Sequence, residues 1–306
     1  MSLLDISRLD VSFSIGLDER LDVIKGLDMS MERTDTISMI GESGSGKSVI
    51  ASAILRILES NAMVSGNVSF EGEDIYGMTE KRLLEMRGKD VCLIPQNASQ
   101  AWDPLTRIGK QMFEFQIKAG IPQDKVKGLS QDVLCRCGFD DPDAIMRAYP
   151  HRLSGGMCQR AMIAMCTSVG PSLVIADEPT KGLDVHSRGH VLKLMTEVGR
   201  DSALLMISHD LQAAMHCNRT SVLYGGVIVE HGPSSDVLIN PLHPYTKGLN
   251  AAHPRNGMRP IPGTGLRAFC NKGCIFYDRC SERKEGCNEP VDLKTVGDSA
   301  VRCLHV

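Results

Sequence analysis

Residues 36–58 read TISMIGESGSGKSVIASAILRIL, a glycine-rich loop set between two apolar segments. Thr36–Ile40 predicts a short buried strand, and Ser48–Leu58 repeats apolar side chains at helical spacing. Between them, Gly41–Ser48 fits the pattern G-x-x-x-x-G-K-[ST] of a phosphate-binding loop. The order strand, loop, helix predicts an α/β domain that binds a nucleotide.

The residues of this loop match the chemistry of phosphate binding. Glycines let backbone amides turn toward phosphate oxygens, and the start of the following helix adds a partial positive charge. The Lys47 ammonium is expected to reach the β- and γ-phosphates, and the Ser48 hydroxyl is expected to bind Mg²⁺. The predicted nucleotide-binding residues of the loop are Gly41, Ser43, Gly44, Ser45, Gly46, Lys47 and Ser48.

Two acidic residues follow another predicted strand. Leu173–Ala176 is continuously apolar, as in a parallel strand covered on both faces, and Asp177 and Glu178 come directly after it. Asp177 can hold Mg²⁺, and the Glu178 carboxylate can accept a proton from an attacking water. Acidic pairs are common at strand ends, but this pair follows a strand of the predicted nucleotide-binding sheet.

Four further candidates are weaker when each is taken alone. Gln96 and His209 each follow a short apolar segment that predicts a strand, and they gain weight because neighbouring strands end in phosphate-site residues. Asp184 has the position of an ordinary acid at a helix start. Phe13 could offer a flat apolar face to an adenine ring or could equally be a core residue.

A second glycine-rich turn lies far downstream of the first. Residues 153–159, LSGGMCQ, contain no lysine and precede an apolar run that predicts a buried helix. One nucleotide cannot use both anion sites of a single compact chain. A second chain, turned head to tail, would let each nucleotide be held from either side. Ser154, Gly155 and Gly156 are therefore predicted to contact a nucleotide bound to the partner.

Together these motifs resemble those of an ABC transporter ATPase, in the order typical of that family. The matches are Gly41–Ser48 (Walker A), Gln96 (Q-loop), Leu153–Gln159 (signature), Leu173–Glu178 (Walker B), Asp184 (D-loop) and His209 (switch). The resemblance implies a P-loop NTPase fold of the α/β class: an ABC ATPase core, whose mixed sheet is joined by an antiparallel β subdomain, and a helical subdomain.

The resemblance also assigns roles to these residues. It implies that ATP is hydrolysed with Mg²⁺ as cofactor and that Phe13 stacks on adenine. The implied catalytic residues are Glu178, His209 and Gln96, the implied Mg²⁺ ligands are Ser48, Gln96 and Asp177, and Asp184 belongs to the nucleotide-binding set.

Three segments narrow the resemblance to importers of oligopeptides, dipeptides and nickel. They are residues 95–111, residues 240–246 (NPLHPYT) and the tail 273–303. The branch implies a head-to-tail dimer with a second ABC ATPase subunit, identical or homologous, that drives two membrane permease subunits supplied by an extracytoplasmic substrate-binding protein. The expected function is ATP-driven import of short peptides. Alternatives are import of nickel or a metal chelate, and a soluble ABC ATPase outside transport.

Three positions depart from the family pattern. The D-loop carries Lys181 and Gly182 where small or hydroxyl residues are usual, which puts its contacts across the dimer in doubt. Trp102 replaces an aliphatic residue in the segment that the resemblance places near the permease. Cys158 lies inside the signature, at a position that is usually variable.

The chain is expected to divide near residue 235. Residues 1–235 form the predicted ABC ATPase domain, with a helical subdomain at about 98–168, and residues 236–306 form the predicted C-terminal extension. Proline recurs after Gly232 and periodicity fades, so residues 250–266 are predicted to be a linker or a chain laid over the surface. Other expected elements are strands at 5–13, 21–30, 91–94 and 203–207, a helix at 80–90, and a hairpin at 221–229 with a two-glycine turn.

The 11 cysteines are distributed unevenly, with a cluster in the C-terminal extension. Structural zinc sites usually contain a tight C-x₂₋₄-C pair, which only Cys270 and Cys274 could supply. Four thiolates on long loops suit a [4Fe–4S] cluster, and the resemblance implies one. Zinc and a group without metal are the alternatives. The predicted ligands are Cys274, Cys280, Cys287 and Cys303.

Composition restricts the partners. The net charge of −3 gives no basic field for nucleic acid, so none is expected as a partner. No stretch approaches the ~18 apolar residues that span a bilayer, and the N-terminus lacks the features of a signal peptide. We therefore expect a peripheral protein at the cytoplasmic face of the cell membrane, held there by other subunits.

Overall fold

The computed structural model describes residues 2–16, 19–263 and 273–306. The chain forms two compact units, one of residues 1–77 with 207–306 and one of residues 78–206. Within the described ranges, no helix has both the length and the apolar character needed to cross a membrane.

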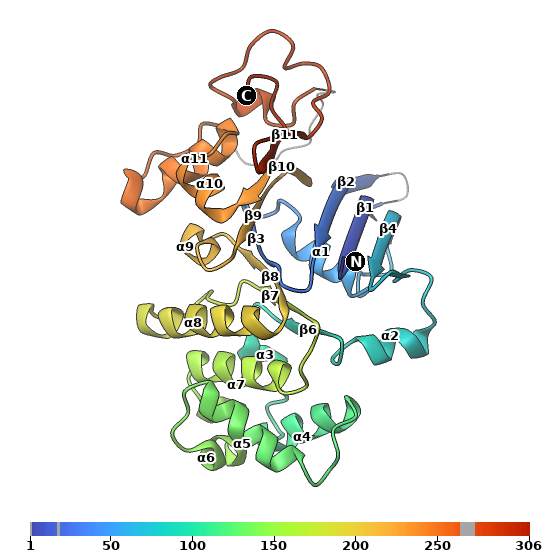
Figure 1. Ribbon diagram of the computed structural model, residues 1–306, viewed down its shortest axis with the longest axis vertical. Helices are drawn as coiled ribbons and strands as arrows, with labels where there is room; N and C mark the ends of the chain where they lie inside the picture. Colours follow the sequence, from blue (N-terminus) through green and yellow to red (C-terminus); the bar gives the residue numbers. More distant parts are fainter. Residues whose placement is uncertain (1, 17–18, 264–272) are drawn as a thin grey trace. The chain divides into compact units, whose positions relative to one another are not determined.

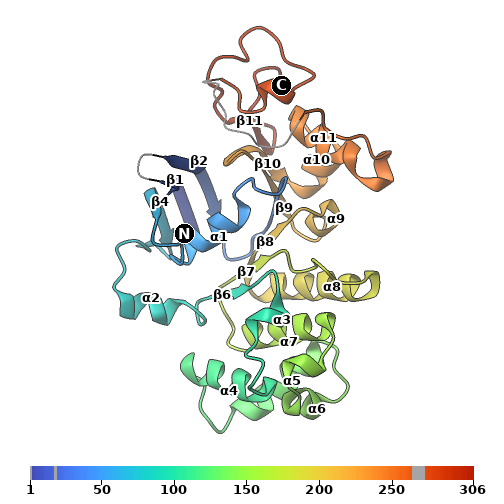
Figure 2. The same ribbon diagram turned by 180° about the vertical axis from the view of Figure 1, so that it is seen from behind.

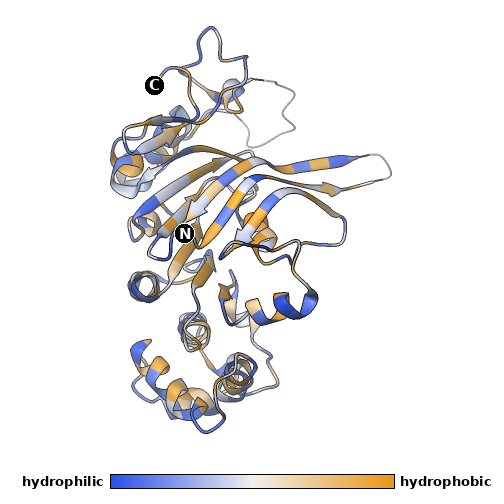
Figure 3. Cartoon of the chain, turned by 45° about the vertical axis from the view of Figure 1, so that its right-hand side comes forward, coloured by the Kyte–Doolittle hydropathy of each residue, from blue (hydrophilic) through white to orange (hydrophobic). Residues whose placement is uncertain are grey.

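An antiparallel sheet lies in the first unit. β1 (Leu4–Ser14) pairs with β2 (Arg20–Met31) on one side and with β4 (Ala62–Phe70) on the other, and β5 (Glu73–Asp74) follows at the edge. Polar and apolar residues alternate along these strands (Figure 3). The two strands expected at 5–13 and 21–30 are confirmed, whereas β4 was not predicted.

A mixed sheet in the same unit carries the glycine-rich loop. β3 (Thr36–Ile40) runs parallel to β9 (Arg219–Tyr224), and β10 (Val227–Pro233) returns antiparallel to β9. The turn uses Gly225 and Gly226 at φ of 56° and 83°, as the two-glycine hairpin signal predicts. The end of the chain joins this sheet, because β10 pairs with β12 (Ser299–Val301), which pairs with β11 (Lys294–Val296).

The helices of the first unit are short. α1 ends at Ile54 rather than at Leu58, because Arg56 adopts a left-handed φ of 49°. The extension also contains helices, although its sequence shows only weak helical periodicity. Its longest helix buries Tyr245 and Thr246, and this burial stabilises it. The helices are α1 (Lys47–Ile54), α9 (Leu211–Ala214), α10 (Ser234–Ile239), α11 (Pro244–Ala252), η2 (Pro254–Asn256) and η3 (Tyr277–Arg279).

One hydrophobic cluster joins the extension to the strand before the loop. Ile40 and Tyr224 from the mixed sheet pack with Tyr245 and Phe276 from the extension. The Tyr224 ring lies 4.5 Å from Tyr245 and 5.1 Å from Phe276, centroid to centroid. The extension therefore shares a core with the strand that leads into the loop.

The second unit contains β6 (Val91–Ile94), which runs parallel to β7 (Leu173–Asp177), together with a group of helices (Figures 1 and 2). α7 packs against α3, α4, α5 and α8. The helices are α2 (Glu80–Met86), α3 (Ala98–Ala101), α4 (Ile108–Lys118), α5 (Val126–Arg136), α6 (Pro142–Arg147), η1 (Pro150–Arg152), α7 (Gly155–Thr167) and α8 (Val185–Asp201).

Two elements, a helix and a strand, lie at the limits of this unit. The helix expected over 80–90 ends at Met86, because Arg87 is extended and Gly88 has a φ of 78°. β8 (Ala203–Ser208) is fully buried, as its apolar sequence predicts, and the division between the two units falls within it.

Candidate functional site

The glycine-rich loop connects β3 to α1 in the first unit. Gly44 and Gly46 have φ of 81° and 102°, a left-handed region that glycine enters at little cost. A side chain at Gly46 would lie 2.5 Å from the Ile24 Cδ1 atom, and one at Gly41 would lie 2.2 Å from the Leu223 carbonyl oxygen. The loop is therefore held in a conformation that its glycines make possible.

Lys47 lies inside this loop. Its ammonium donates hydrogen bonds to the Gly41 carbonyl at 2.8 Å and to the Glu42 carbonyl at 2.9 Å, and the residue is only 7% exposed. A buried ammonium at the start of a helix creates a positive site in a concave loop, which suits a phosphate. The loop residues left exposed to solvent are Ser43, Gly44 and Ser48.

Two other predicted residues belong to the same unit. Phe13 lies near the end of β1, paired with Leu21 and Ala62, and is half-buried. His209 is exposed and directly follows β8. Their stacking and switch roles stay predictions.

In the second unit, Asp177 is the last residue of β7 and Glu178 follows it. Glu178 has a φ of 49° and is 9% exposed. A non-glycine residue in this conformation costs about 1–3 kcal/mol, and such residues gather at functional sites. Gln96 lies just past the end of β6, whose parallel register with β7 pairs Ile94 with Ala176. Gln96 and the two acids therefore leave the same edge of one strand pair.

The donors predicted for Mg²⁺ have suitable chemistry. Asp177 supplies a carboxylate, Gln96 an amide oxygen and Ser48 a hydroxyl, and all three are the oxygen ligands that this hard cation prefers. Gln96 and Ser48 are exposed, so an ion and its water shell can reach them.

The second glycine turn forms the start of α7. The Ser154 hydroxyl caps the helix by accepting the Met157 amide at 3.2 Å. Gly156 packs so closely that a Cβ atom there would lie 2.6 Å from the Ser187 Oγ atom, whereas Gly155 has open space around it. The turn is thus fixed against α8 on one side and free on the other.

Asp184 fixes the start of α8. Its carboxylate accepts the backbone amides of His186 and Ser187 at 3.0 Å each, and the hydrogen bonds from Ser187 lower the pKa of this carboxyl. The helix-start position expected for Asp184 is confirmed. Gly182 has a φ of 73°, which explains a glycine there, and nothing in the structure explains Lys181.

The close contact at Gly156 predicts different effects for two neighbouring substitutions. Gly156→Ala should force Ser187 aside and lower the free energy of unfolding by about 1–3 kcal/mol. Gly155→Ala should change it by less than about 0.5 kcal/mol, because its Cβ meets nothing. Urea denaturation of both variants tests this, and equal midpoints would show that the contact has no energetic weight.

Two of the three positions that depart from the family pattern, Trp102 and Cys158, are in contact. The Trp102 indole N–H donates to the Cys158 carbonyl at 3.3 Å, and Trp102 is 2% exposed. The Cys158 thiol is also buried, and its burial raises the pKa of the thiol. The segment that follows the Q-loop is therefore attached to the helix that begins with the second glycine turn.

Four cysteines of the extension surround one small cavity. Cys274, Cys280, Cys287 and Cys303 all line a space of about 50 Å³. Burial, and then the charges of the neighbouring thiols, raise the pKa of Cys274. The Cys287 Sγ atom lies 3.1 Å from the His305 Nε2 atom. All four thiols thus line the same cavity.

Their arrangement is nevertheless not that of a metal centre. Among the described residues, no three His, Cys, Asp or Glu side chains form a group that could hold a metal ion. The ligand types fit an iron–sulfur or zinc site, but the side chains do not converge as ligands. Cys270 lies outside the described residues.

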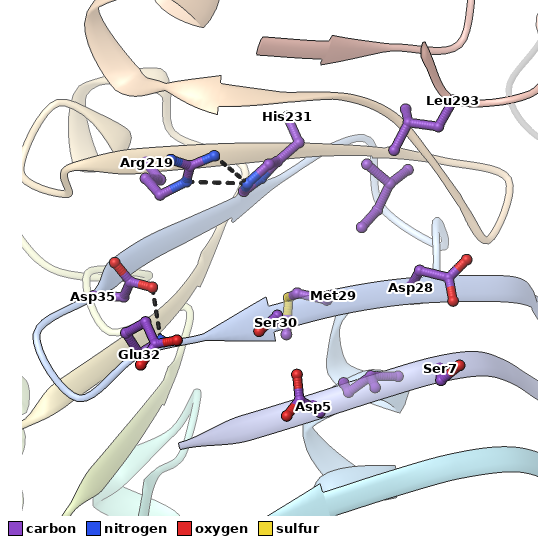
Figure 4. Close-up of a pocket in the computed structure, with 12 residues that line it drawn as sticks. Asp5, Ser7, Asp28, Met29, Ser30, Glu32, Asp35, Arg219, His231 and Leu293 are labelled. Carbon is purple, nitrogen blue, oxygen red and sulfur yellow. Dashed lines mark hydrogen bonds between the residues drawn. The ribbon is translucent and has the colours of Figure 1, made fainter. Parts of the chain in front are cut away.

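A larger cavity in the first unit is not part of the predicted site. It measures about 750 Å³, is lined by residues such as Asp28, Asp35 and Arg219, and shares no lining residue with the glycine-rich loop (Figure 4). His231, also in its wall, accepts hydrogen bonds from Arg219. Burial, and then the Arg219 charge, lower the pKa of His231 to about 4, so it is neutral at physiological pH.

Sequence reasoning missed three residues that contact the loop or the second glycine turn. Tyr245 and Arg279 bind the backbone and side chain of Glu42, respectively, and Ser187 packs on Gly156. Tyr245 and Arg279 lie in stretches that were recognised only as family hallmarks. No sequence signal marks Ser187.

The chain combines a glycine-rich phosphate loop, two acids at the end of β7 and just after it, and a second glycine turn. These features define an ATPase of the ATP-binding-cassette class. The sequence matches the "ABC transporter" family over residues 24–181 and the "Oligopeptide/dipeptide transporter, C-terminal region" family over residues 229–287.

Curated relatives match over nearly their whole length. The probable D,D-dipeptide transport ATP-binding protein DdpD of Escherichia coli K12 is 36% identical, covering 98% of this chain and 95% of the relative. The oligopeptide transport ATP-binding proteins OppD of Salmonella typhimurium LT2 and AppD of Bacillus subtilis 168 are 34% and 33% identical, covering 98% and 99% of this chain and 92% and 96% of theirs.

Solved structures share the fold. A dimeric, post-hydrolysis structure of the ATP-binding cassette MJ0796 with ADP and Pi has a TM-score of 0.68 at 19% identity, covering 76% of this chain and 98% of that one. CbiO1 of Clostridium perfringens has a TM-score of 0.65 at 22% identity, covering 78% and 91%. The chain belongs to the ABC transporter ATP-binding family, and its ATP hydrolysis is coupled to transport.

Proposed function

We propose that this chain is the ATP-binding subunit of an importer of short peptides. One observation carries the proposal: an ABC ATPase sequence and the C-terminal region of oligopeptide and dipeptide transporters occur in the same chain. Relatives named as dipeptide or oligopeptide transport proteins match almost end to end. The nickel alternative and the non-transport alternative lack comparable support.

The proposed site uses residues in the roles expected from sequence. The Lys47 ammonium binds the β- and γ-phosphates of ATP, and Phe13 stacks on the adenine. Glu178 accepts the proton of the attacking water, while His209 and Gln96 orient the reacting groups. Mg²⁺, held by Ser48, Gln96 and Asp177, neutralises phosphate charge when bound.

The proposed assembly is a head-to-tail pair of ATPase subunits. Gly155 is exposed at the start of α7 with open space around it, as expected of a surface that meets a partner's nucleotide. A related cassette of this fold forms a dimer. The pair would act on two membrane permeases at the cytoplasmic face of the membrane, and a substrate-binding protein on the other face would deliver the peptide.

Transport by the intact complex tests the function. Vesicles that contain the purified complex with this chain, supplied with Mg-ATP, should accumulate labelled di- and oligopeptides. The substitution Lys47→Ala should abolish this accumulation. Accumulation of Ni²⁺ in place of peptides would favour the nickel alternative. An ATPase that associates with no membrane subunit would contradict the proposal.

We also propose that the four cysteines of the extension hold a [4Fe–4S] cluster, with zinc as the alternative. Their common cavity supports this, although the thiols must move to act as ligands. Anaerobically purified protein should contain iron and inorganic sulfide in about equal amounts. Cys280→Ser should lose both, and Cys135→Ser, which changes an exposed thiol of the second unit, should not. Zinc, or no metal in any preparation, would contradict the cluster.

A further inference from the structure

The second residue of the nucleotide loop is bound to the C-terminal extension. The Glu42 backbone N–H donates to the Tyr245 hydroxyl at 2.9 Å. Its two carboxylate oxygens accept hydrogen bonds from the Arg279 guanidinium at 2.8 and 3.0 Å. The extension therefore holds both the main chain and the side chain of one loop residue.

Arg279 is well placed to make this contact, which joins its guanidinium to the Glu42 carboxylate at 2.8 Å. Its side chain is 9% exposed, and its Nε atom donates to the Pro262 carbonyl at 2.9 Å. The guanidinium lies 5.7 Å from the centroid of the Tyr224 ring, in the core that joins the extension to the mixed sheet. A forked, two-point contact with a carboxylate fixes direction as well as distance, which an ammonium could not do.

The Tyr245 side chain is also held firmly in place. Its ring is fully buried, and its backbone N–H donates to the His243 Nδ1 atom at 3.0 Å. Burial lowers the pKa of His243 to about 4, so the neutral imidazole can accept this bond. The Glu230 carboxylate in turn accepts the backbone amide of His243 at 2.9 Å. A chain of hydrogen bonds thus runs from β10 through α11 to the loop.

Glu42 also takes part in holding the phosphate-binding lysine. The Glu42 carbonyl accepts the Lys47 ammonium at 2.9 Å and the Ser45 amide at 3.2 Å. Displacement of Glu42 would move an acceptor of Lys47 and change the curvature of the loop. The contact between Glu42 and the extension therefore helps to fix the position of the Lys47 ammonium, which is proposed to bind the phosphates.

We propose that Arg279 and Tyr245 are positioning residues that hold the nucleotide loop in its ATP-binding conformation. The C-terminal extension is, on this account, a brace for the loop. The inference rests on the proposed role of the loop in ATP binding. If losing the brace lowers the competent fraction of the loop to a tenth, the apparent Kd rises about tenfold.

Binding of a fluorescent ATP analogue to the full-length chain tests the brace. Arg279→Gln and Glu42→Gln should each weaken binding about tenfold, and the double variant should be no weaker than either single variant, because both remove the same contact. Arg279→Lys should be intermediate. The matched control is Lys247→Gln, which removes an exposed ion pair with Glu282 of the same extension and should leave the Kd unchanged.

Hydrogen exchange separates positioning from general stability. Arg279→Gln should raise exchange at residues 41–48 while β6 and β7 keep theirs. Unchanged Kd and unchanged loop exchange in Arg279→Gln would overturn the inference, and so would additive losses in the double variant. Lys47→Ala serves as the reference: if it binds ATP like the original chain, the proposed nucleotide site is wrong, whatever Arg279 does.

Discussion

Replacing Glu178 with glutamine is expected to lower the rate of ATP hydrolysis by about 10²–10⁴-fold while ATP still binds. Glutamine keeps the shape of the side chain but cannot accept the proton of an attacking water. Steady-state ATPase assays and binding of a fluorescent ATP analogue measure the two effects separately.

The backbone at Glu178 gives this prediction a structural basis. Its φ of 49° is held directly after Asp177 at the end of a buried strand. Glu71 provides a matched control, since it is a glutamate with a φ of 52° in a turn of the first unit. Glu71→Gln should leave the hydrolysis rate within twofold. Full activity in Glu178→Gln would mean that another group accepts the proton.

Replacing Trp102 with alanine is expected to lower the free energy of unfolding by about 3–5 kcal/mol. Trp102 is 2% exposed, so the truncation would leave a large cavity beside α7. Chemical denaturation followed by circular dichroism measures the change through its midpoint.

A second substitution separates packing from hydrogen bonding. Trp102→Phe keeps an aromatic ring but removes the indole N–H that donates to the Cys158 carbonyl. It should lower the free energy of unfolding by only about 1–2 kcal/mol. Equal losses in the two variants would assign the stabilisation to the hydrogen bond. A loss below 1 kcal/mol in Trp102→Ala would contradict the packing argument.

Local patterns predicted the part of the fold that surrounds the loop. The strand at 36–40, the glycine loop and the two-glycine hairpin follow from apolar runs and from glycines that adopt positive φ. Helix ends were predicted less well. Leu55 and Leu58 continue the apolar spacing of α1, but Arg56 turns left-handed and the helix has already ended at Ile54.

The site was predictable where chemistry is local and unpredictable where it depends on tertiary contact. Lys47 and Glu178 are marked by their own neighbours in sequence. Arg279 lies 237 residues from Glu42, and only folding reveals that their side chains meet. The helices of the extension were not predicted, because its order comes from burying Tyr245 and Phe276 against another part of the chain and not from periodicity.

We propose that two copies of this cassette, or this cassette and a homologous one, clamp ATP between them. A structure of the complete transport complex with Glu178→Gln and saturating Mg-ATP tests it most directly. We expect each ATP to be buried between Lys47 of one subunit and the turn containing Ser154 and Gly156 of the facing subunit. ATP seated on a single subunit, with that turn left in solvent, would contradict it.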